Sequence, residues 1–408
     1  MPEVNGGDTA WMLVATALVM VMLPGLALFY GGLVRRKNVL STIMHSFFGL
    51  ALTSVVWVLV GFSLAFGKDV GGLGLVGGLD FLGFSNVGLE PSESYAPTVP
   101  FVLFAGFQLM FAAITPALIS GAFAERKRFR SFVIFTVLWS LLVYSPIAHW
   151  VWALDGWLFK LGALDFAGGT VVHASSGVAA LVAALAIGHR RSNGDRMEPH
   201  DIPMTVLGAG LLWFGWFGFN AGSALTAGGL AANAVVVTNT AAAAATISWV
   251  LVSWFHKGKV SVVGAACGAV AGLVAITPAS GFVTAGGAVV IGLAVGGLCY
   301  SATLLRERLR IDDALDVFAV HGVGGVFGAI ATGVFATTAI NAFPGLVDGN
   351  AGQVVTQAIA VGAVVAYAAV ATLAIIKAVD FVLGLRVPEH EEEVGLDLAV
   401  HGEVAYQA

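Results

Sequence analysis

Residues 11–34 read WMLVATALVMVMLPGLALFYGGLV, an apolar run without a single charged side chain. As a helix, a run of this length extends about 36 Å, which exceeds the roughly 30 Å hydrocarbon core of a bilayer. A basic cluster at residues 35–37 ends it. A signal peptide begins with a positively charged region, whereas residues 1–10 contain Glu3 and Asp8 and no Lys or Arg. We therefore expect a retained membrane-spanning helix.

The composition extends this prediction to the whole chain. Of its 408 residues, 58% are hydrophobic and 11% charged, and the mean hydropathy is +0.91. A soluble chain carries roughly a quarter charged residues, so this one could not cover a water-facing surface. The sequence predicts an all-α integral membrane protein with eleven spans. They lie near residues 11–34, 42–66, 99–123, 131–151, 170–188, 203–222, 230–255, 260–277, 284–304, 315–336 and 352–384.

The basic residues orient these spans. They cluster in the segments that follow the odd-numbered spans, and Lys68 and Lys160 are the two that fall on the opposite side. Because cytoplasmic loops are enriched in Lys and Arg, the N-terminus is predicted outside and the C-terminus inside. We expect a multi-pass protein of the inner (plasma) membrane. Nothing in the net charge of -5 suggests nucleic-acid binding.

Two histidines occur in matching contexts. Asp165 precedes the Val-His pair ending at His173 by eight residues, and Asp313 precedes the one ending at His321 by the same interval. The fifth and tenth spans begin near these positions. Transporters are commonly built from inverted repeats with the site near the midplane. The sequence predicts two inverted five-helix repeats, about 11–188 and 203–336, then a long eleventh helix at about 352–384. Together they form a membrane domain over residues 1–386, and residues 387–408 form a polar, acidic tail.

Histidines inside a membrane are costly and usually face a pathway. One His on each of two helices, without Cys or carboxylate at ligand spacing, falls short of a metal site, and we expect no metal and no cofactor. Aromatic side chains and a hydroxyl form a second group of candidates, suited to a small cation that must lose its water, because aromatic faces attract desolvated cations. This group comprises Phe107 and Phe111, the run from Trp213 to Ser223 with Trp216 and Phe219 in it, and the pair Trp150 and Trp152.

Several long motifs resemble the ammonium transporter family, which includes the Rhesus glycoproteins, and most closely its bacterial or archaeal Amt branch. The resemblance covers nearly the whole chain. It implies the same eleven helices and orientation, assembled as a homotrimer with one pore per subunit. The motifs are LPGLALFYGG at 23–32, GAFAER at 121–126, LDFAGGTVVH at 164–173, GWFGFNAGS at 215–223 and DVFAVHGVGG at 316–325.

The resemblance also implies roles for the candidates. Ammonium, with methylammonium as a second candidate substrate, would bind an outer site lined by Phe107, Trp152 and Ser223, with Asp165 behind it. Phe111 and Phe219 would form a hydrophobic gate, Trp216 would border the pore, and His173 and His321 would line it. Residues 387–408 resemble a cytoplasmic regulatory tail that meets a PII-type signal protein.

Three alternatives stay open at this point. The protein could be a passive ammonia gas channel, or an ammonium sensor coupled to a PII-type partner. A membrane enzyme is the third, but it would need a nucleophile or ligand set that the sequence does not offer, so we expect no enzyme. An electrogenic transporter, in which ammonium loses a proton that the histidine pair relays, is the leading hypothesis.

Overall fold

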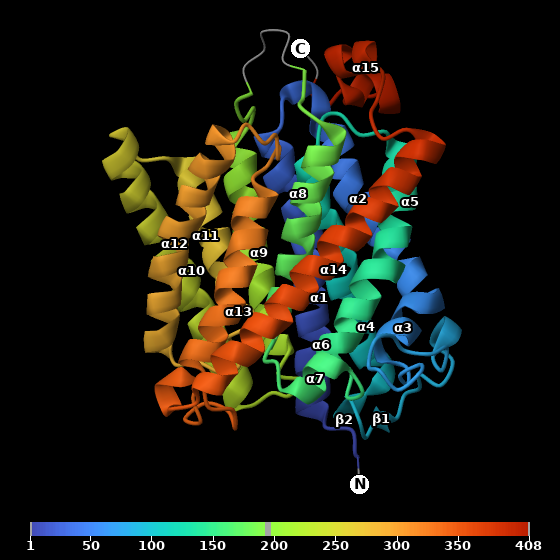
Figure 1. Ribbon diagram of the computed structural model, residues 1–408, viewed down its shortest axis with the longest axis vertical. Helices are drawn as coiled ribbons and strands as arrows, with labels where there is room; N and C mark the ends of the chain where they lie inside the picture. Colours follow the sequence, from blue (N-terminus) through green and yellow to red (C-terminus); the bar gives the residue numbers. More distant parts are fainter. Residues whose placement is uncertain (1, 192–196, 407–408) are drawn as a thin grey trace.

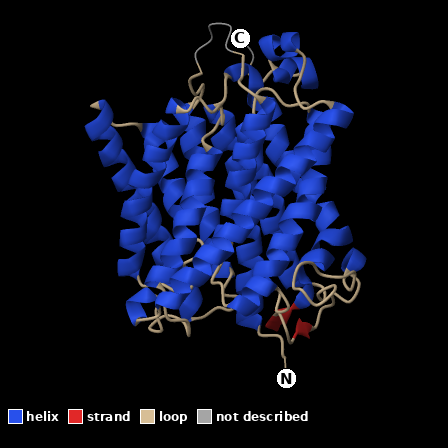
Figure 2. Cartoon of the chain, in the orientation of Figure 1, coloured by secondary structure: helices blue, strands red, loops and turns tan. Residues whose placement is uncertain are grey.

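The computed structural model describes residues 2–191 and 197–406. It is a bundle of long, roughly aligned helices, with the N-terminus at one end and the C-terminus at the other (Figures 1 and 2). We call these ends the N-terminal face and the tail face. The α-helices are α1 Gly6–Leu33, α2 Val39–Val56, α3 Phe62–Phe66, α4 Phe101–Ile119, α5 Phe129–Trp139, α6 Ser145–Trp152, α7 Trp157–Leu161, α8 Ser175–Ile187, α9 Ile202–Gly222, α10 Gly229–Lys257, α11 Val262–Ile276, α12 Ala285–Arg308, α13 Gly324–Phe335, α14 Ala351–Leu383 and α15 Glu389–Val394.

Short helical turns and one hairpin complete the secondary structure of the described residues. The strands β1 (Pro91–Ser92) and β2 (Ala96–Pro100) pair antiparallel at the N-terminal face. Five turns are π-helical: η2 Trp57–Gly61, η5 Ser140–Tyr144, η6 Gly169–Ala174, η7 Phe318–Val323 and η9 Asp397–His401. Four are 3₁₀ turns: η1 Arg36–Asn38, η3 Leu82–Phe84, η4 Ser120–Phe123 and η8 Leu346–Asp348.

In the described part of the chain, ten helical segments are long and apolar enough to cross a membrane, and α11 is a shorter apolar helix. They follow the predicted spans closely; the last was expected at 352–384 and α14 runs over Ala351–Leu383. The segment expected at 260–277 is the shortest, because Pro278 follows it. Proline has no N–H for a helical bond, so the helix ends close to it, although Thr277 itself keeps a helical φ of -52° and ψ of -50°.

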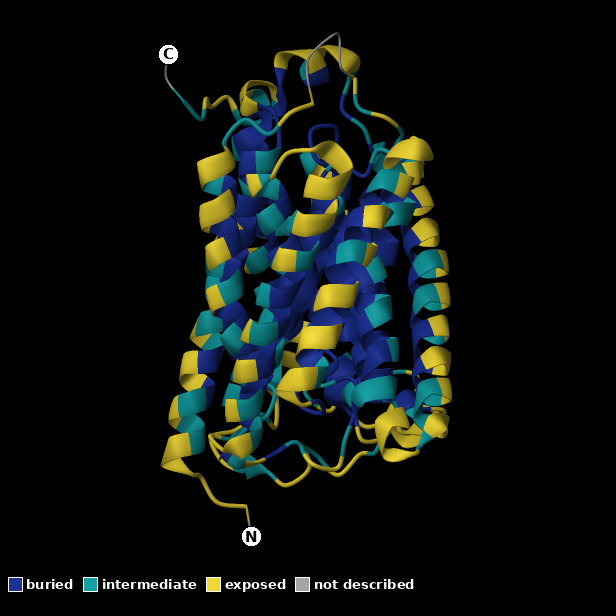
Figure 3. Ribbon diagram, turned by 90° about the vertical axis from the view of Figure 1, so that its left-hand side faces the viewer, coloured by how far each residue is buried: buried dark blue, intermediate teal, exposed yellow. Residues whose placement is uncertain are grey.

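Exposed residues lie on the outside of the bundle and buried residues lie between the helices (Figure 3), and many of the exposed side chains are large and apolar. Val370 on α14 is 70% exposed and Leu207 on α9 is 58% exposed. Water would oppose such a surface, whereas lipid accommodates it. Burial and hydropathy thus agree that the exterior faces a bilayer.

Glycines let the helices approach closely. A Cβ added to Gly208 of α9 would overlap the backbone of Phe29 in α1, and one added to Gly215 would overlap the Met22 side chain. Small residues have this role at helix contacts in membranes, where the hydrophobic effect does not drive association. Helices α1 and α9 would be the first helices of the two expected repeats.

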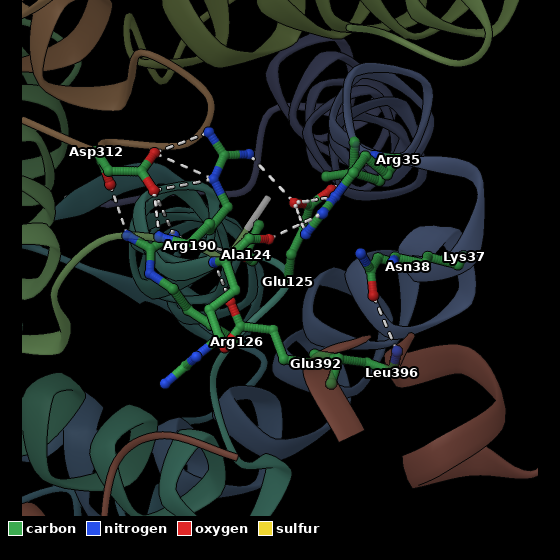
Figure 4. A network of polar contacts seen from close by, with 12 residues as sticks. Arg35, Lys37, Asn38, Ala124, Glu125, Arg126, Arg190, Asp312, Glu392 and Leu396 are labelled. Atoms are coloured by element: carbon green, nitrogen blue, oxygen red, sulfur yellow. Dashed lines mark hydrogen bonds and ion pairs between the residues drawn. The ribbon is translucent and has the colours of Figure 1, made fainter. Parts of the chain in front are cut away.

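A buried polar network closes the tail face (Figure 4). The Glu125 carboxylate lies 3.0 Å from Arg35 and 3.3 Å from Arg190, and Arg190 also lies 2.8 Å from Asp312. Burial opposes ionisation of Asp312, but hydrogen bonds from Arg190 and the charge of Arg126 hold its pKa at about 2. Burial also opposes ionisation of Glu125, and the charges of Arg190 and Arg35 lower the pKa of its carboxyl. Both acids are therefore ionised and paired.

The tail packs against this face. Glu392, which is 1% exposed, accepts a hydrogen bond of 2.7 Å from the backbone N–H of Arg191 and pairs with Arg386 at 2.8 Å. The backbone N–H of Leu396 donates to Asn38 at 2.9 Å. The tail expected at 387–408 is thus docked on the body of the chain through residue 406; residues 407–408 lie outside the described residues.

Candidate functional site

A cavity of about 210 Å³ opens near the N-terminal face, where α4, α6 and the end of α9 meet. Trp152 comes from the last turn of α6, and Ser223 directly follows α9. Phe111 forms part of the wall, whereas Phe107, one turn earlier on α4, packs behind it and is not in the lining. The lining residues are Phe66, Ser94, Tyr95, Phe104, Gln108, Phe111, Trp152, Leu154, Phe166, Ser223 and Leu225.

Polar atoms also face this largely aromatic space. The Ser223 hydroxyl donates to the Phe219 carbonyl at 2.9 Å, which leaves its oxygen lone pairs for an incoming donor. Gln108 Oε1 is buried and has no hydrogen-bond partner. Buried polar atoms are rarely left unpaired, so this oxygen marks a place for a donor. Sequence reasoning missed Gln108, and the signal was a lone amide in an otherwise apolar span.

Two closely packed phenyl rings lie beside the cavity: Phe111 lines it, and Phe219 packs against Phe111. The centroids of Phe111 and Phe219 are 4.2 Å apart, with the planes at 32°. Trp152 meets Phe111 edge-on at 5.9 Å, and Phe107 meets it edge-on at 4.9 Å. The two stacked rings are fully or nearly fully buried. A charged ion that passed them would lose its hydration without compensation, which is expensive.

The two predicted histidines lie together beyond these rings. Nδ1 of His173 and Nδ1 of His321 are 3.2 Å apart, and both side chains are buried. One ring therefore donates and the other accepts, so the two imidazoles hold opposite tautomers. The His173 ring stacks at 5.3 Å on Trp216, whose indole N–H donates to Thr277 at 2.8 Å, and lies 5.9 Å from Phe219. Aromatic rings and imidazoles thus form one continuous column.

Local backbone geometry places both histidines. His173 lies in the π-helical turn η6 and His321 in η7. Such turns are rare, and they occur frequently at functional sites. A Cβ on Gly177 would overlap the backbone of Gly322, and one on Gly325 would lie 2.9 Å from the Cβ of His173. The close crossing of the two helices, and hence the imidazole contact, requires glycine there.

The two predicted aspartates differ in their hydrogen bonding. Asp165 accepts from the N–H groups of Gly168 and Gly169, each at 2.7 Å, and from those of Thr170 and Val171 at 2.8 and 3.2 Å. It also accepts from the Thr170 hydroxyl.

Asp313 accepts one hydrogen bond, from Phe318 N–H at 2.7 Å, and its other oxygen is buried without a partner. Asp165 also touches the cavity indirectly, since its carbonyl accepts from the Trp152 indole at 2.9 Å. Neither carboxylate belongs to a metal cluster: over residues 2–191 and 197–406, no group of three or more His, Cys, Asp or Glu side chains could hold a metal ion.

Comparison with known proteins places this site in context. The chain is 52% identical over 404 residues to an ammonium transporter of Bacillus subtilis, covering 98% of each chain. Its fold matches the crystal structure of Saccharomyces cerevisiae Mep2 with a TM-score of 0.91 at 40% identity, covering 99% of this chain and 92% of that one. It also matches a structure described as a Sensor Amt Protein, with a TM-score of 0.89 at 32% identity, covering 97% and 98%.

Residues 10–406 match the family described as the Ammonium Transporter Family. This range includes every helix of the bundle apart from the first residues of α1, and every residue of the cavity, the stacked rings and the histidine pair. The motifs that suggested the resemblance in the sequence are confirmed as those of a family member. The chain belongs to the Ammonium Transporter Family.

Proposed function

We propose that the protein carries ammonium across the membrane by binding it in the cavity, removing a proton and passing ammonia along the column of rings. The observation that carries this proposal is the order of the parts. A polar aromatic cavity, a closed pair of phenyl rings and a hydrogen-bonded imidazole pair follow one another from the N-terminal face inward. The family relationship supplies the substrate, and methylammonium is a second candidate.

In the proposed topology the chain crosses the inner (plasma) membrane eleven times, with the N-terminal face outside and the tail in the cytoplasm. The distribution of Lys and Arg supports the orientation. The matching π-helical turns at His173 and His321 support two inverted five-helix repeats, about 11–188 and 203–336, within a membrane domain ending at 386. The subunits would assemble as a homotrimer with one pore each.

Binding would use both charge and direction. The faces of Trp152 and Phe111 stabilise a cation as it loses water, by about 2 kcal/mol when desolvated. Ser223 Oγ and Gln108 Oε1 accept N–H hydrogen bonds, which potassium cannot donate. Asp165 holds the Trp152 indole through its carbonyl and supports the site from behind; Phe107 supports the phenyl pair.

The phenyl pair Phe111 and Phe219 would then select for the neutral molecule. An N–H bond of ammonium breaks, its electron pair stays on nitrogen, and the proton remains to be carried. Ammonia crosses the apolar column beside Trp216, whereas potassium has no proton to lose. Selectivity thus follows from acid–base chemistry and not from pore diameter alone.

The histidine pair would carry the proton. Nε2 of His173 has no partner, so it accepts the proton while its Nδ1–H moves to Nδ1 of His321. His321 releases its Nε2 proton toward the tail face, and the net charge moved is one per ammonium. Both rings must then return to their starting tautomers before His173 can accept the next proton. A passive gas channel differs in that the proton stays outside.

Solid-supported membrane electrophysiology on proteoliposomes tests this proposal. An ammonium pulse should give a current that an equal potassium pulse does not. Replacing both His173 and His321 with leucine should abolish the ammonium current. An unchanged, ammonium-selective current in that double variant would refute the relay, and internal acid–base changes without current would identify a gas channel.

A second candidate function is ammonium sensing through a partner. The likeness to a Sensor Amt Protein and the docked tail over 387–406 favour it. The tail would then bind a cytoplasmic PII-type signal protein. Removing residues 387–408 should leave transport in liposomes largely intact but abolish binding of such a partner. No enzymatic reaction is proposed, because the Bacillus subtilis relative is named as an ammonium transporter.

A further inference from the structure

Gln357 is a buried amide side chain in the largely apolar helix α14. It lies near the start of this helix, which crosses the bundle obliquely and packs against α13 and α8 (Figure 1). The side chain is 1% exposed. Amide side chains of membrane helices form hydrogen bonds across helix contacts, and a buried polar group without a partner is costly. The partners of Gln357 therefore indicate which segments it holds in place.

The Gln357 amide pairs with both backbone polar groups of Leu164, in the loop between α7 and η6. Its Oε1 accepts from the Leu164 N–H at 2.7 Å, and its Nε2 donates to the Leu164 carbonyl at 2.7 Å. Nε2 also donates to the carbonyl of Ala329 on α13 at 2.9 Å. Turned over, the amide would point its NH₂ group at the Leu164 N–H, so these contacts fix its orientation. One side chain thus ties this loop to two helices.

The tied residue directly precedes the support of Trp152. The Asp165 carbonyl accepts from the Trp152 indole N–H at 2.9 Å. On the other side of Asp165, the backbone N–H of Phe166 donates to the carbonyl of Pro278, in the turn after α11, at 3.1 Å. The Asp165 carbonyl therefore lies between two anchored residues, Leu164 and Phe166. The anchors determine where the indole is held at the cavity wall.

The Asp165 carboxylate has a different set of contacts. It accepts from the backbone N–H groups of residues 168–171, which lie in and just before the turn η6 that carries His173. The carboxylate is therefore fastened to η6 without any contribution from α14. Loss of the Gln357 contacts should release the backbone on one side of the Asp165 carbonyl and leave the turn of His173 capped.

We infer that Gln357 is a positioning residue for the ammonium site: it fixes the backbone beside Asp165 so that the Asp165 carbonyl holds the Trp152 indole at the cavity wall. The inference rests on the proposed function and deepens it, because it assigns part of the affinity for ammonium to a residue outside the cavity lining. An amide that served the stability of the bundle alone would leave the affinity unchanged.

Current titrations compare Gln357→Met with a control on the same helix. Methionine keeps the length of the side chain but removes its donors and its acceptor. The half-saturation concentration for ammonium should rise about fivefold, equivalent to about 1 kcal/mol, with a nearly unchanged maximal current. Thr372→Val, the control, removes the hydrogen bond that Trp139 donates to α14 at 2.9 Å, roughly 22 Å further along the helix. An equal rise in the control, or no rise in Gln357→Met, would overturn the positioning role.

A double-mutant cycle tests whether Gln357 acts through Trp152. Trp152→Phe keeps an aromatic face but removes the indole N–H that the Asp165 carbonyl holds. In the Trp152→Phe background, Gln357→Met should change the half-saturation concentration less than about twofold. The same fold-change in both backgrounds would overturn the route through Trp152. Gln357→Asn, which withdraws the amide from Leu164 by one CH₂ group, takes the place of Gln357→Met in the cycle if the methionine variant folds poorly.

Nitrogen NMR of tryptophan-labelled protein in liposomes reports the indole directly, with Trp152→Phe to assign its signal. Gln357→Met should shift the Trp152 indole N–H resonance, because the hydrogen bond to the Asp165 carbonyl changes, and Thr372→Val should leave the resonance in place. An unshifted signal in Gln357→Met would overturn the inference. Because this measurement needs no transport, its failure is distinguishable from failure of the proposed ammonium transport.

Discussion

Asn substitutions at Asp165 and Asp313 should have very different costs, although the two residues occupy equivalent places before the two histidines. Asp165 uses both carboxylate oxygens, and backbone N–H groups donate to each. An asparagine keeps one oxygen and places an NH₂ group where the other was. Two buried backbone N–H groups then face a donor. Each buried group left unpaired costs about 1–3 kcal/mol, so Asp165→Asn should cost about 2–6 kcal/mol.

Asp313→Asn is the matched control. The single hydrogen bond from Phe318 N–H can pass to the asparagine oxygen, and the NH₂ group takes the place of the oxygen that has no partner. We expect a cost below about 1 kcal/mol, because no donor loses its acceptor. Aspartate and asparagine are matched in size, so neither variant changes the volume of the side chain.

Equilibrium unfolding in mixed detergent and SDS micelles measures both free energies. The variants should be compared at equal protein concentration, since any assembly of subunits contributes to stability. Equal losses of unfolding free energy in the two variants, or a larger loss in Asp313→Asn, would refute the assignment of hydrogen bonds as the origin of the difference.

Three further predictions address the site and the tail face. Gln108→Met keeps the side-chain volume but removes the unpaired acceptor. It should weaken the apparent ammonium affinity about tenfold in current titrations, in line with about 1.4 kcal/mol for one hydrogen bond to a cation. An unaltered titration would exclude a role of Gln108 in binding. Gly177→Ala should abolish transport in correctly inserted protein, because its methyl group would overlap the backbone of Gly322 and separate the imidazoles; a fully active variant would show that this crossing is not needed. Burial lowers the pKa of Lys127 to about 7, whereas in the unfolded chain it stays near 10.4. Between these values the folded state binds fewer protons than the unfolded state, so the free energy of unfolding should rise with pH from about 7 to about 10. Lys127→Met should lack that rise when unfolded in detergent, and a rise identical to that of the wild type would assign it to another group.

The spans and the histidine pair could be predicted from the sequence for simple reasons. Long apolar runs separated by basic clusters indicate membrane helices, and the repeated spacing from Asp165 to His173 and from Asp313 to His321 marked corresponding positions. The structure places the Nδ1 atoms of the two imidazoles 3.2 Å apart. The helix ends were also predicted closely where a charge or a proline follows, as at the end of α11.

Other features depend on contacts between distant segments. Tyr95 lines the cavity but belongs to no sequence pattern that sets it apart, and the lone amide of Gln108 in an apolar span does not by itself indicate that it faces the same cavity. The π-helical turns arise from packing against neighbouring helices and have no periodicity of their own in the sequence. The difference between Asp165 and Asp313 depends on which backbone N–H groups reach each carboxylate, which spacing alone does not determine. Likewise, Gln357 gave no sign of pairing with Leu164, 193 residues earlier in the chain.

The most direct test of the account is the simultaneous measurement of current and internal pH in proteoliposomes that contain the purified protein, after an ammonium pulse and after an equal potassium pulse. We predict a current with ammonium and none with potassium, and loss of that current when both His173 and His321 are replaced by leucine. A potassium current of similar size would contradict selection by deprotonation. Internal alkalinisation without any current would contradict the proton relay and leave a neutral ammonia channel.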